Sequence, residues 1–576
     1  MSDAFKLHII EKIVDEAGSD EIDESLIEVP PDTKLGDYAF PCFVLSKKLK
    51  KAPPQIAEYL ADKIQPDDMI SSVKNVGPYL NFFVNKAKLA STTLVRIQKE
   101  GVDYGKASVG SGKTVLIEYP GPNTNKPLHL GHVRNMALGQ SMSKILGSQG
   151  FDVKRVNINN DRGVHICKSM LAYQKWGEGK TPESEDRKSD HFVGDYYVMF
   201  AQKAKEDDSL EEEAKAMLAK WEAGDKEIRA LWKQMNDWAF SGFKDTYSRF
   251  GMEDFDKEYY ESETYEGGKK TVAEGLKKGL FQKKDDGAAY IDLSAEGLGE
   301  KILLRSDGTS VYVTQDLYTA QLRHNDFSFD KMIYVVATEQ NYHFKVLFTL
   351  LKKLGYAWAE GCHHFAYGMV HLPEGKMKSR EGTVVDADDL MLDMQELAKK
   401  EIVKRHPDIE VQRADDRGHM IGLGAIKFYL LKTDAIKDIT FNKEESLSFD
   451  GDSGPYLQYT HARACSILRK AADSGMMVST EVEFGALSHD SEKEVIGLLT
   501  EFPLKVQEAA ENYRPHMIAQ HLLALGRAFN EFYHACSCIN EENEDKRAAR
   551  LLLIDCVRQV LDNGLELLDV LAPEEM

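Results

Sequence analysis

VLIEYPGPNTNKPLHLGHVRNMALGQSMSKILG, residues 115–147, predicts a strand, a loop and a helix in that order. The apolar run at 115–118 is typical of a buried parallel strand, and the Pro- and Gly-containing residues 119–123 interrupt it. Apolar residues then recur at mostly helical spacing from Val133 to Leu146. Because a helix N-terminus presents unpaired N–H groups and the positive end of a dipole, the start of this helix suits a phosphate.

Two histidines, His129 and His132, lie on either side of Gly131 at the expected helix start. Their imidazoles could donate hydrogen bonds to phosphate oxygens, and a glycine lets an adenine ring approach the backbone. A zinc pair is disfavoured, because the zinc-protease pattern needs a spacing of four with a glutamate between. The spacing alone leaves another interpretation open, in which the histidines cap the helix or fill the core.

The longer string from Glu118 to Asn135 closely resembles the HIGH signature of class I aminoacyl-tRNA synthetases, in the form found in arginyl-tRNA synthetases. The resemblance implies that His129 and His132 act in catalysis and, with Gly131, bind ATP. It extends over essentially the whole chain, as far as the last residues, LAPEEM at 571–576.

A second signature follows an expected strand at 364–370. The loop GKMKSREG, residues 375–382, carries three cations between glycines and could close on the developing charge of the ATP phosphates. It resembles the family's KMSKS loop, except that Ser379 stands where the second lysine is usual. The resemblance implies that Lys126, before the HIGH motif, substitutes for that lysine, and Lys378 or Arg380 is the alternative.

The resemblance therefore implies two overlapping sets of residues. The catalytic set is His129, His132, Lys126, Lys376, Lys378 and Arg380. The ATP-binding set is Gly131, His129, His132, Met369, Val370, Lys376 and Met377. We expect Mg²⁺ to accompany ATP and pyrophosphate and no residue of the chain to be a dedicated metal ligand.

The amino acid substrate is expected to be arginine. A guanidinium is planar, always charged and forked, so its pocket needs a carboxylate that can accept a bidentate pair. By resemblance, Tyr312 and Asp316 hold the guanidinium, and Asn123 and Gln340 hold the α-amino group. Glu118 is implied as a further pocket carboxylate.

The predicted fold class is multidomain α/β, with a Rossmann-like parallel-sheet catalytic domain. We expect an α+β tRNA-contact domain at 1–106, the catalytic domain at 107–382, a helical connecting region at 383–445 that contacts the tRNA stem, and an all-α anticodon-binding bundle at 446–576. An acidic, aromatic segment at about 165–260 is expected to be a helical insertion in the catalytic domain.

Within this plan, residues 7–17 and 54–64 are predicted helices and 76–82 a predicted strand. Strand-like runs at 288–293, 302–304, 311–314 and 331–337, with a helix at 343–354, favour a parallel sheet that binds its ligands at the carboxyl ends of the strands.

Two groups of residues are candidates for contacts with RNA. In the first region, four lysines either contact phosphates of the tRNA elbow or form a solvated helix face; they are Lys47, Lys48, Lys50 and Lys51. The motif at 446–463 resembles the opening of the family's anticodon-binding bundle, and Tyr456 and Tyr459 near Arg463 could stack on bases or belong to the core.

Composition sets wider limits. The net charge of −21 over 576 residues argues against general nucleic-acid binding but permits a local basic groove. Seven cysteines without a CxxC pair argue against a disulfide framework and a four-cysteine zinc site. No apolar run approaches the roughly 20 residues of a membrane span, and no targeting segment is evident. We expect a cytoplasmic monomer that binds no membrane.

The resemblance implies an ATP-dependent arginine–tRNA ligase, which forms arginyl-adenylate from L-arginine and ATP and transfers arginine to the 3′ end of its tRNA. One alternative is a small-molecule nucleotidyltransferase of the same HxGH superfamily, which would not need the end modules. The other is a catalytically inactive RNA-binding paralogue, which would not be expected to retain both histidines.

Overall fold

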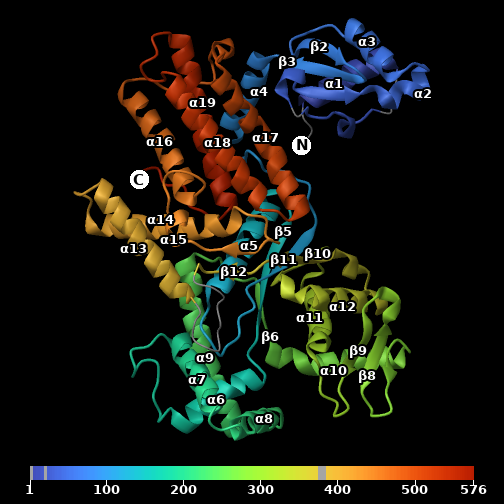
Figure 1. Ribbon diagram of the computed structural model, residues 1–576, viewed down its shortest axis with the longest axis vertical. Helices are drawn as coiled ribbons and strands as arrows, with labels where there is room; N and C mark the ends of the chain where they lie inside the picture. The colour runs from blue at the N-terminus through green and yellow to red at the C-terminus, as the bar shows by residue number, and fades with distance from the viewer. Residues whose placement is uncertain (1–3, 19–21, 31, 374–384) are drawn as a thin grey trace.

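The computed structural model describes residues 4–18, 22–30, 32–373 and 385–576 (Figure 1). At its centre lies a five-stranded parallel sheet with the strand order β11-β10-β4-β5-β6. The strands are β4 (Thr114–Glu118), β5 (Asp152–Asn159), β6 (Lys257–Tyr260), β10 (Lys331–Ala337) and β11 (Cys362–Tyr367). The predicted parallel sheet is confirmed.

The order of the strands reverses at β4. The chain moves from β4 to β5 and β6 on one side, and later places β10 and β11 on the other. Such a reversal leaves a crevice at the carboxyl ends of the strands, where ligands of open α/β sheets bind. The loop that follows Glu118 leaves β4 at this edge.

Helix α5 (Leu130–Ser148) follows that loop and is buried on nearly all sides. One face lies on the sheet, and the rest is enclosed by C-terminal helices (Figure 1). A Cβ on Gly139 would lie 2.3 Å from Cγ of Tyr119, so glycine permits the close approach of α5 to the end of β4. Helix α12 (Asn341–Lys353) crosses between β10 and β11, close to its predicted bounds.

The helical insertion is confirmed. It consists of α6 (Val164–Trp176), α7 (Ser189–Lys203), α8 (Ser209–Glu222) and α9 (Lys226–Phe250), which share a core around the buried Trp221. The insertion extends away from the sheet at the lower end of the molecule (Figure 1).

Two predictions for the next segment are wrong. The runs at 288–293 and 302–304 do not join the parallel sheet; β8 (Ala289–Leu293) and β9 (Gly299–Leu304) form a separate antiparallel sheet with β7 (Gln282–Lys283). The run at 311–314, expected as a strand, begins helix α11 (Tyr312–Phe327). Helical packing overrides β propensity there, because Val313, Leu317 and Ala320 lie on one buried face. Helix α10 (Glu261–Lys277) packs against α11.

The N-terminal unit is α+β. Helices α1 (Ala4–Ala17), α2 (Ser46–Leu49) and α3 (Pro53–Lys63) accompany an antiparallel sheet in the order β1-β3-β2. Its strands are β1 (Tyr38–Pro41), β2 (Ile70–Val76) and β3 (Tyr79–Val84). The predicted single strand at 76–82 is therefore wrong: Gly77, with φ +57°, and Pro78 form the turn of a hairpin.

The remaining elements are mostly helical. Strands β12 (Val370–His371) and β13 (Ile439–Thr440) form a short parallel pair. The helices after β12 are α13 (Ala387–Arg405), α14 (Val411–Leu431), α15 (Lys443–Ser446), α16 (Gly454–Asp473), α17 (Asp490–Asn512), α18 (His516–Ala535) and α19 (Glu544–Leu567). Helix α4 (Lys86–Glu100) packs on α17 and α19. One apolar core joins α4, α5 and the bundle. Among the described residues, no helix has both the length and the hydropathy needed to cross a membrane.

Candidate active site

The signature histidines form a reciprocal cap at the start of α5. His129 is the N-cap residue, and its Nδ1 accepts the N–H of Gly131 at 3.1 Å. The Nδ1 of His132 accepts the N–H of His129, also at 3.1 Å. The two rings lie with their centroids 4.0 Å apart. The capping interpretation left open by the sequence is thus correct for both rings.

This arrangement also determines what the rings offer a ligand. Burial, with the charge of Lys126, lowers the pKa of His129 to about 3. Burial, with His129 and Lys126, holds the pKa of His132 well below its usual value. Both imidazoles are therefore neutral, and since Nδ1 accepts in each, the proton is on Nε2. The site presents two N–H donors, which suit phosphate oxygens and not a metal ion.

Glycine at position 131 gives a ligand access to the backbone, and it is also required by the packing around it. A Cβ at this position would lie 2.9 Å from Cε1 and 3.0 Å from Nδ1 of His129. The missing side chain therefore leaves room for the capping ring of His129.

Arg134, fully buried on α5, organises the neighbouring wall of the site. Its guanidinium donates to the carbonyls of Gly368 and Met369 at 2.6 and 3.2 Å, and to those of Ala435 and Lys437 at 3.1 and 2.9 Å. The predicted ATP-binding residues Met369 and Val370 are held here. Met369 is partly exposed, but the side chain of Val370 is buried in strand β12, so Val370 could meet a ligand only through its backbone.

The segment after residue 384 pairs with the histidine loop. The N–H of Leu130 donates to the carbonyl of Val385, and the N–H of Ala387 donates to the carbonyl of Leu128, each at 3.0 Å. His129 and Asp386 are thereby directly opposed. The predicted loop residues Lys376, Met377, Lys378, Ser379 and Arg380 lie outside the described residues.

The predicted arginine-binding residues come from separate elements near the carboxyl edge of the sheet. Gln340 ends the turn after β10 and is exposed, and Asn123 lies in the loop after β4. On the first turns of α11, Tyr312 is 67% exposed, and Asp316 Oδ2 accepts a hydrogen bond from His343 Nε2 at 2.6 Å.

Comparison with known proteins now identifies the family. The model for the class I (R) tRNA synthetase catalytic domain matches residues 93–443, the arginyl-tRNA synthetase N-terminal domain matches 5–84, and the DALR anticodon-binding domain matches 457–576. The chain belongs to the arginyl-tRNA synthetase family.

Relatives of the same family match over nearly their whole length. An arginine–tRNA ligase of Treponema denticola is 49% identical over 549 residues, which cover 94% of this chain and 93% of the relative. One of Bacteroides thetaiotaomicron is 45% identical over 581 residues, 96% of each chain. The solved arginyl-tRNA synthetase of Thermus thermophilus is 27% identical, with a TM-score of 0.83 over 99% of this chain and 100% of that one.

Glu118, which the arginyl-tRNA synthetase resemblance places in the substrate pocket, already has a cationic partner. The fully buried guanidinium of Arg323 on α11 forms an ion pair with its carboxylate. Burial raises the pKa of Glu118, and the charge of Arg323 opposes that rise. Arg323 also lies over the rings of Tyr259 and Tyr334, at 5.1 and 5.6 Å from their centroids.

Glu261 is a further candidate site residue, and it lies outside both signature motifs. This residue follows β6 and opens α10, and it is 8% exposed. Within the described parts of the chain, its carboxylate has no hydrogen bond or ion pair. Burial raises its pKa to about 7; Arg162 opposes the rise, and the nearby charges of Asp316 and Asp161 add to it. A glutamate directly after a parallel strand is the signal that could have found it.

A basic groove of about 980 Å³ lies between α13, α14, α16 and the C-terminal residues. Despite the net charge of −21, its lining is rich in cations: Arg405, Arg413, Arg417, Arg463, Arg469 and Lys470. Tyr459, 41% exposed, lines it, and Arg463 lies over the ring of Tyr533. The hydroxyl of Tyr456 instead accepts a hydrogen bond from Asn530, so of the two predicted tyrosines only Tyr459 faces the groove.

Proposed function

We propose that this protein is an arginine–tRNA ligase, which activates L-arginine with ATP and transfers the arginyl group to the 3′ end of its tRNA. One observation carries the proposal. At the reversal of strand order, two Nε2–H donors on α5 suit the phosphates of ATP, and the carboxylates of Asp316 and Glu261 on neighbouring elements suit a cationic side chain.

No side-chain nucleophile is needed. The carboxylate of arginine attacks the α-phosphate of ATP and pyrophosphate leaves; a 3′-terminal hydroxyl of the tRNA then attacks the carbonyl of the adenylate and AMP leaves. The chain contributes by positioning the reactants and by offering donors where phosphate charge develops. His129 and His132 supply two such donors. We propose that Mg²⁺ enters with ATP on its phosphate oxygens.

Lys126 is proposed as the cation that compensates for Ser379. Its charge lowers the pKa of both histidines, which supports a position close to them. A contact felt mainly in the transition state acts on kcat. We therefore expect Lys126→Ala to lower kcat for pyrophosphate exchange by about 10- to 100-fold. If Lys126→Ala is silent and Lys378→Ala is severe, Lys378 supplies the charge and this role of Lys126 is wrong.

For the arginine pocket, we propose that Tyr312, Asp316 and Glu261 face the guanidinium, and that Asn123 and Gln340 bind the α-amino group. Glu118 then has a supporting role. Its pairing with Arg323 ties the end of β4 to α11, which carries Tyr312 and Asp316.

We propose four functional regions, at 1–106, 107–382, 383–445 and 446–576, with tRNA contacts in the first, third and fourth. The basic groove supports an RNA contact at the junction of the last two regions.

We also propose that the protein is a cytoplasmic monomer. All seven cysteines of the chain lie among the described residues, and all are free thiols. Free thiols suit a reducing compartment.

The decisive experiment is ATP–pyrophosphate exchange with each of the twenty amino acids, with and without bulk tRNA. We expect exchange with arginine alone, and only when tRNA is present. Exchange driven by a substrate other than an amino acid would indicate the nucleotidyltransferase alternative. Binding of tRNA without any exchange would indicate the inactive paralogue.

A further inference from the structure

Helix α7 of the insertion packs directly against the signature loop. Gly194 faces Pro127: a Cβ on this glycine would lie 2.6 Å from Cδ of Pro127 and 3.5 Å from Cα of Lys126. The helix and the loop therefore meet at a distance that excludes even one methyl group. Because this loop leads into His129, its position depends on where α7 lies.

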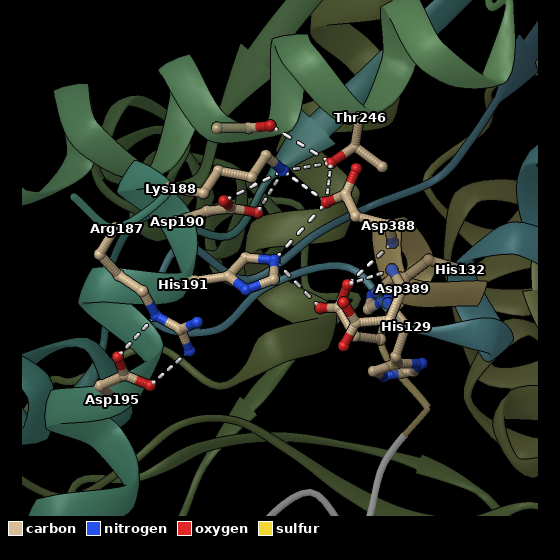
Figure 2. Close-up of polar contacts among 12 residues, drawn as sticks. His129, His132, Arg187, Lys188, Asp190, His191, Asp195, Thr246, Asp388 and Asp389 are labelled. Carbon is tan, nitrogen blue, oxygen red and sulfur yellow. Dashed lines mark hydrogen bonds and ion pairs between the residues drawn. The ribbon is translucent and has the colours of Figure 1, made fainter. Parts of the chain in front are cut away.

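At the start of the same helix, Lys188 and its neighbours form a buried polar cluster (Figure 2). The ammonium of Lys188 lies 2.6 Å from Oδ2 of Asp388 and 3.1 Å from Oδ1 of Asp190. It also donates to Oγ1 of Thr246 on α9 at 2.6 Å, and that hydroxyl donates to Asp388 Oδ2 at 3.0 Å. The insertion thus holds Asp388 from two helices.

His191 extends this cluster toward the signature histidines (Figure 2). Its Nε2 lies 3.2 Å from Oδ2 of Asp386 and 3.5 Å from Oδ2 of Asp388. Burial opposes the charged ring, but the carboxylates of Asp388, Asp386 and Asp190 raise the pKa of His191 above its ordinary value. The other oxygen of Asp386 caps α13 by accepting the N–H groups of Asp388 and Asp389, at 2.8 and 3.2 Å.

The segment held in this way is the one that pairs with the histidine loop. The hydrogen bonds from Leu130 to Val385 and from Ala387 to Leu128 lie on either side of the opposed residues His129 and Asp386. A displacement of Asp386 would therefore move the backbone that sets the ring of His129, whose Nδ1 is already committed to the cap.

A metal site is the competing interpretation, because ligand atoms of Asp190, His191 and Asp388 lie within 4.8 Å of one another. The ammonium of Lys188 lies within 3.1 Å of oxygens of both aspartates. The ammonium thus offsets the negative charge of the two carboxylates, which would otherwise favour a metal ion.

We propose that His191, with Lys188, is a positioning residue for His129: the helical insertion holds Asp386 and Asp388, and through them sets the Nε2–H donor of His129. This inference rests on the proposed function and deepens it. It makes the insertion a structural part of the ATP site, although its helices lie at the lower end of the molecule (Figure 1).

The test is a double-mutant cycle in pyrophosphate exchange, with rates normalised to active sites. His191→Ala should lower kcat on the order of 10- to 100-fold, the loss that a small misplacement of a catalytic group causes. The KM for arginine should change less than about twofold, since the arginine-binding residues lie on other elements. His191→Gln, which keeps an uncharged N–H donor, should recover a large part of the loss.

In a His129→Ala background, His191→Ala should cost less than about threefold, because the group it positions is gone. Gly194→Ala displaces the loop without changing charge. It should likewise lower kcat when His129 is present and have little further effect on kcat in the His129→Ala background. Arg187→Ala is the matched control: this cation, also close to the start of α7, pairs with Asp195 on the exposed side, and its loss should have no effect in either background (Figure 2).

Losses that multiply in the double variants would overturn the positioning role, as would an effect of His191→Ala confined to thermal stability. No arginine-dependent exchange by the unmodified protein would instead refute the proposed function. The two failures are therefore distinguishable in one set of measurements.

Discussion

A neutral histidine that accepts through Nδ1 presents its Nε2–H to a ligand, and both signature histidines are in this state. Each ring thus has two tasks, since it satisfies a backbone donor of α5 and leaves one N–H available. Capping and phosphate binding, which the sequence presents as alternatives, are compatible in the folded chain.

We expect His129→Ala or His132→Ala to lower kcat for arginine activation by about 10²-fold or more, the order lost with one preorganised donor. The KM for arginine should change little, because neither ring belongs to the proposed guanidinium pocket. Loss of the cap should also lower the free energy of unfolding by about 1 kcal/mol. Steady-state pyrophosphate exchange and thermal unfolding measure the two effects, and an unchanged kcat would contradict the catalytic role.

At the proposed arginine pocket, the raised pKa of Glu261 leads us to expect that arginine binding depends on pH. With a pKa of about 7 in the free protein, its carboxyl is protonated below that pH, and a bound guanidinium would lower this pKa. Arginine binding is then strongest above pH 7 and weakens as the pH falls. At one pH unit below the pKa of Glu261, the affinity for arginine should be about tenfold lower than well above that pKa.

The measurement is the KM for arginine between pH 6 and 8. Glu261→Gln should bind arginine more weakly at pH 8 and show little change with pH. His343, paired with Asp316, also has a raised pKa, so His343→Gln is the control. If Glu261→Gln keeps the slope of the unmodified protein and His343→Gln loses it, the pH dependence belongs to His343.

At the scale of elements, α5 is the helix on which the site depends. It begins with the capping histidines, carries Arg134 in its first turns and packs closely on Tyr119 at Gly139. The ring of Tyr119 is fully buried, so it has little freedom to move away.

Gly139→Ala should therefore destabilise the protein although alanine favours helices. The methyl group would meet the Tyr119 ring at 2.3 Å, and overpacking of this kind costs about 1–3 kcal/mol. Gly147→Ala, on the same helix with no atom within 4 Å of its Cβ position, is the control and should be neutral or slightly stabilising. Thermal unfolding of the two variants should differ in sign; equal midpoints would show that Tyr119 yields without cost.

At the scale of the whole molecule, the site helix is joined to the C-terminal bundle by a buried charge cluster. Asp569, just after α19, pairs with Lys427 on α14 and with Lys144 on α5, at 2.5 and 2.8 Å. Lys427 is 4% exposed. Together with the shared apolar core, this cluster makes the bundle and the catalytic sheet one packed body.

Asp569→Ala should lower the free energy of unfolding by about 3–5 kcal/mol, because it leaves the ammonium of Lys427 buried without its carboxylate. Glu566→Gln is the matched control. That carboxylate also pairs with Lys144, but its side chain is 60% exposed, so its loss should cost less than about 1 kcal/mol. Calorimetric unfolding compares the variants, and equal losses would mean that burial of the cluster does not matter.

Much of this architecture can be predicted from local sequence. Strand β4, the start of α5, strand β10 and the helical insertion follow from the period of apolar residues and from Pro, Gly and capping positions, which act over a few residues. The resemblance to the family indicated the signature histidines and Asp316, because the motifs that carry them are continuous in the chain.

The tertiary structure alone decided the rest. Residues 289–304 form strands as predicted, but only packing places them in a separate antiparallel sheet, because a strand's partner depends on distant residues. The ion pair of Glu118 with Arg323 and the contact of His191 with Asp386 also join residues far apart in the chain. The raised pKa of Glu261 likewise depends on the fold, because it comes from burial and from the nearby charges of Asp316 and Asp161. Local patterns specify elements; burial and charge pairing between elements, which no short window of sequence contains, specify the site.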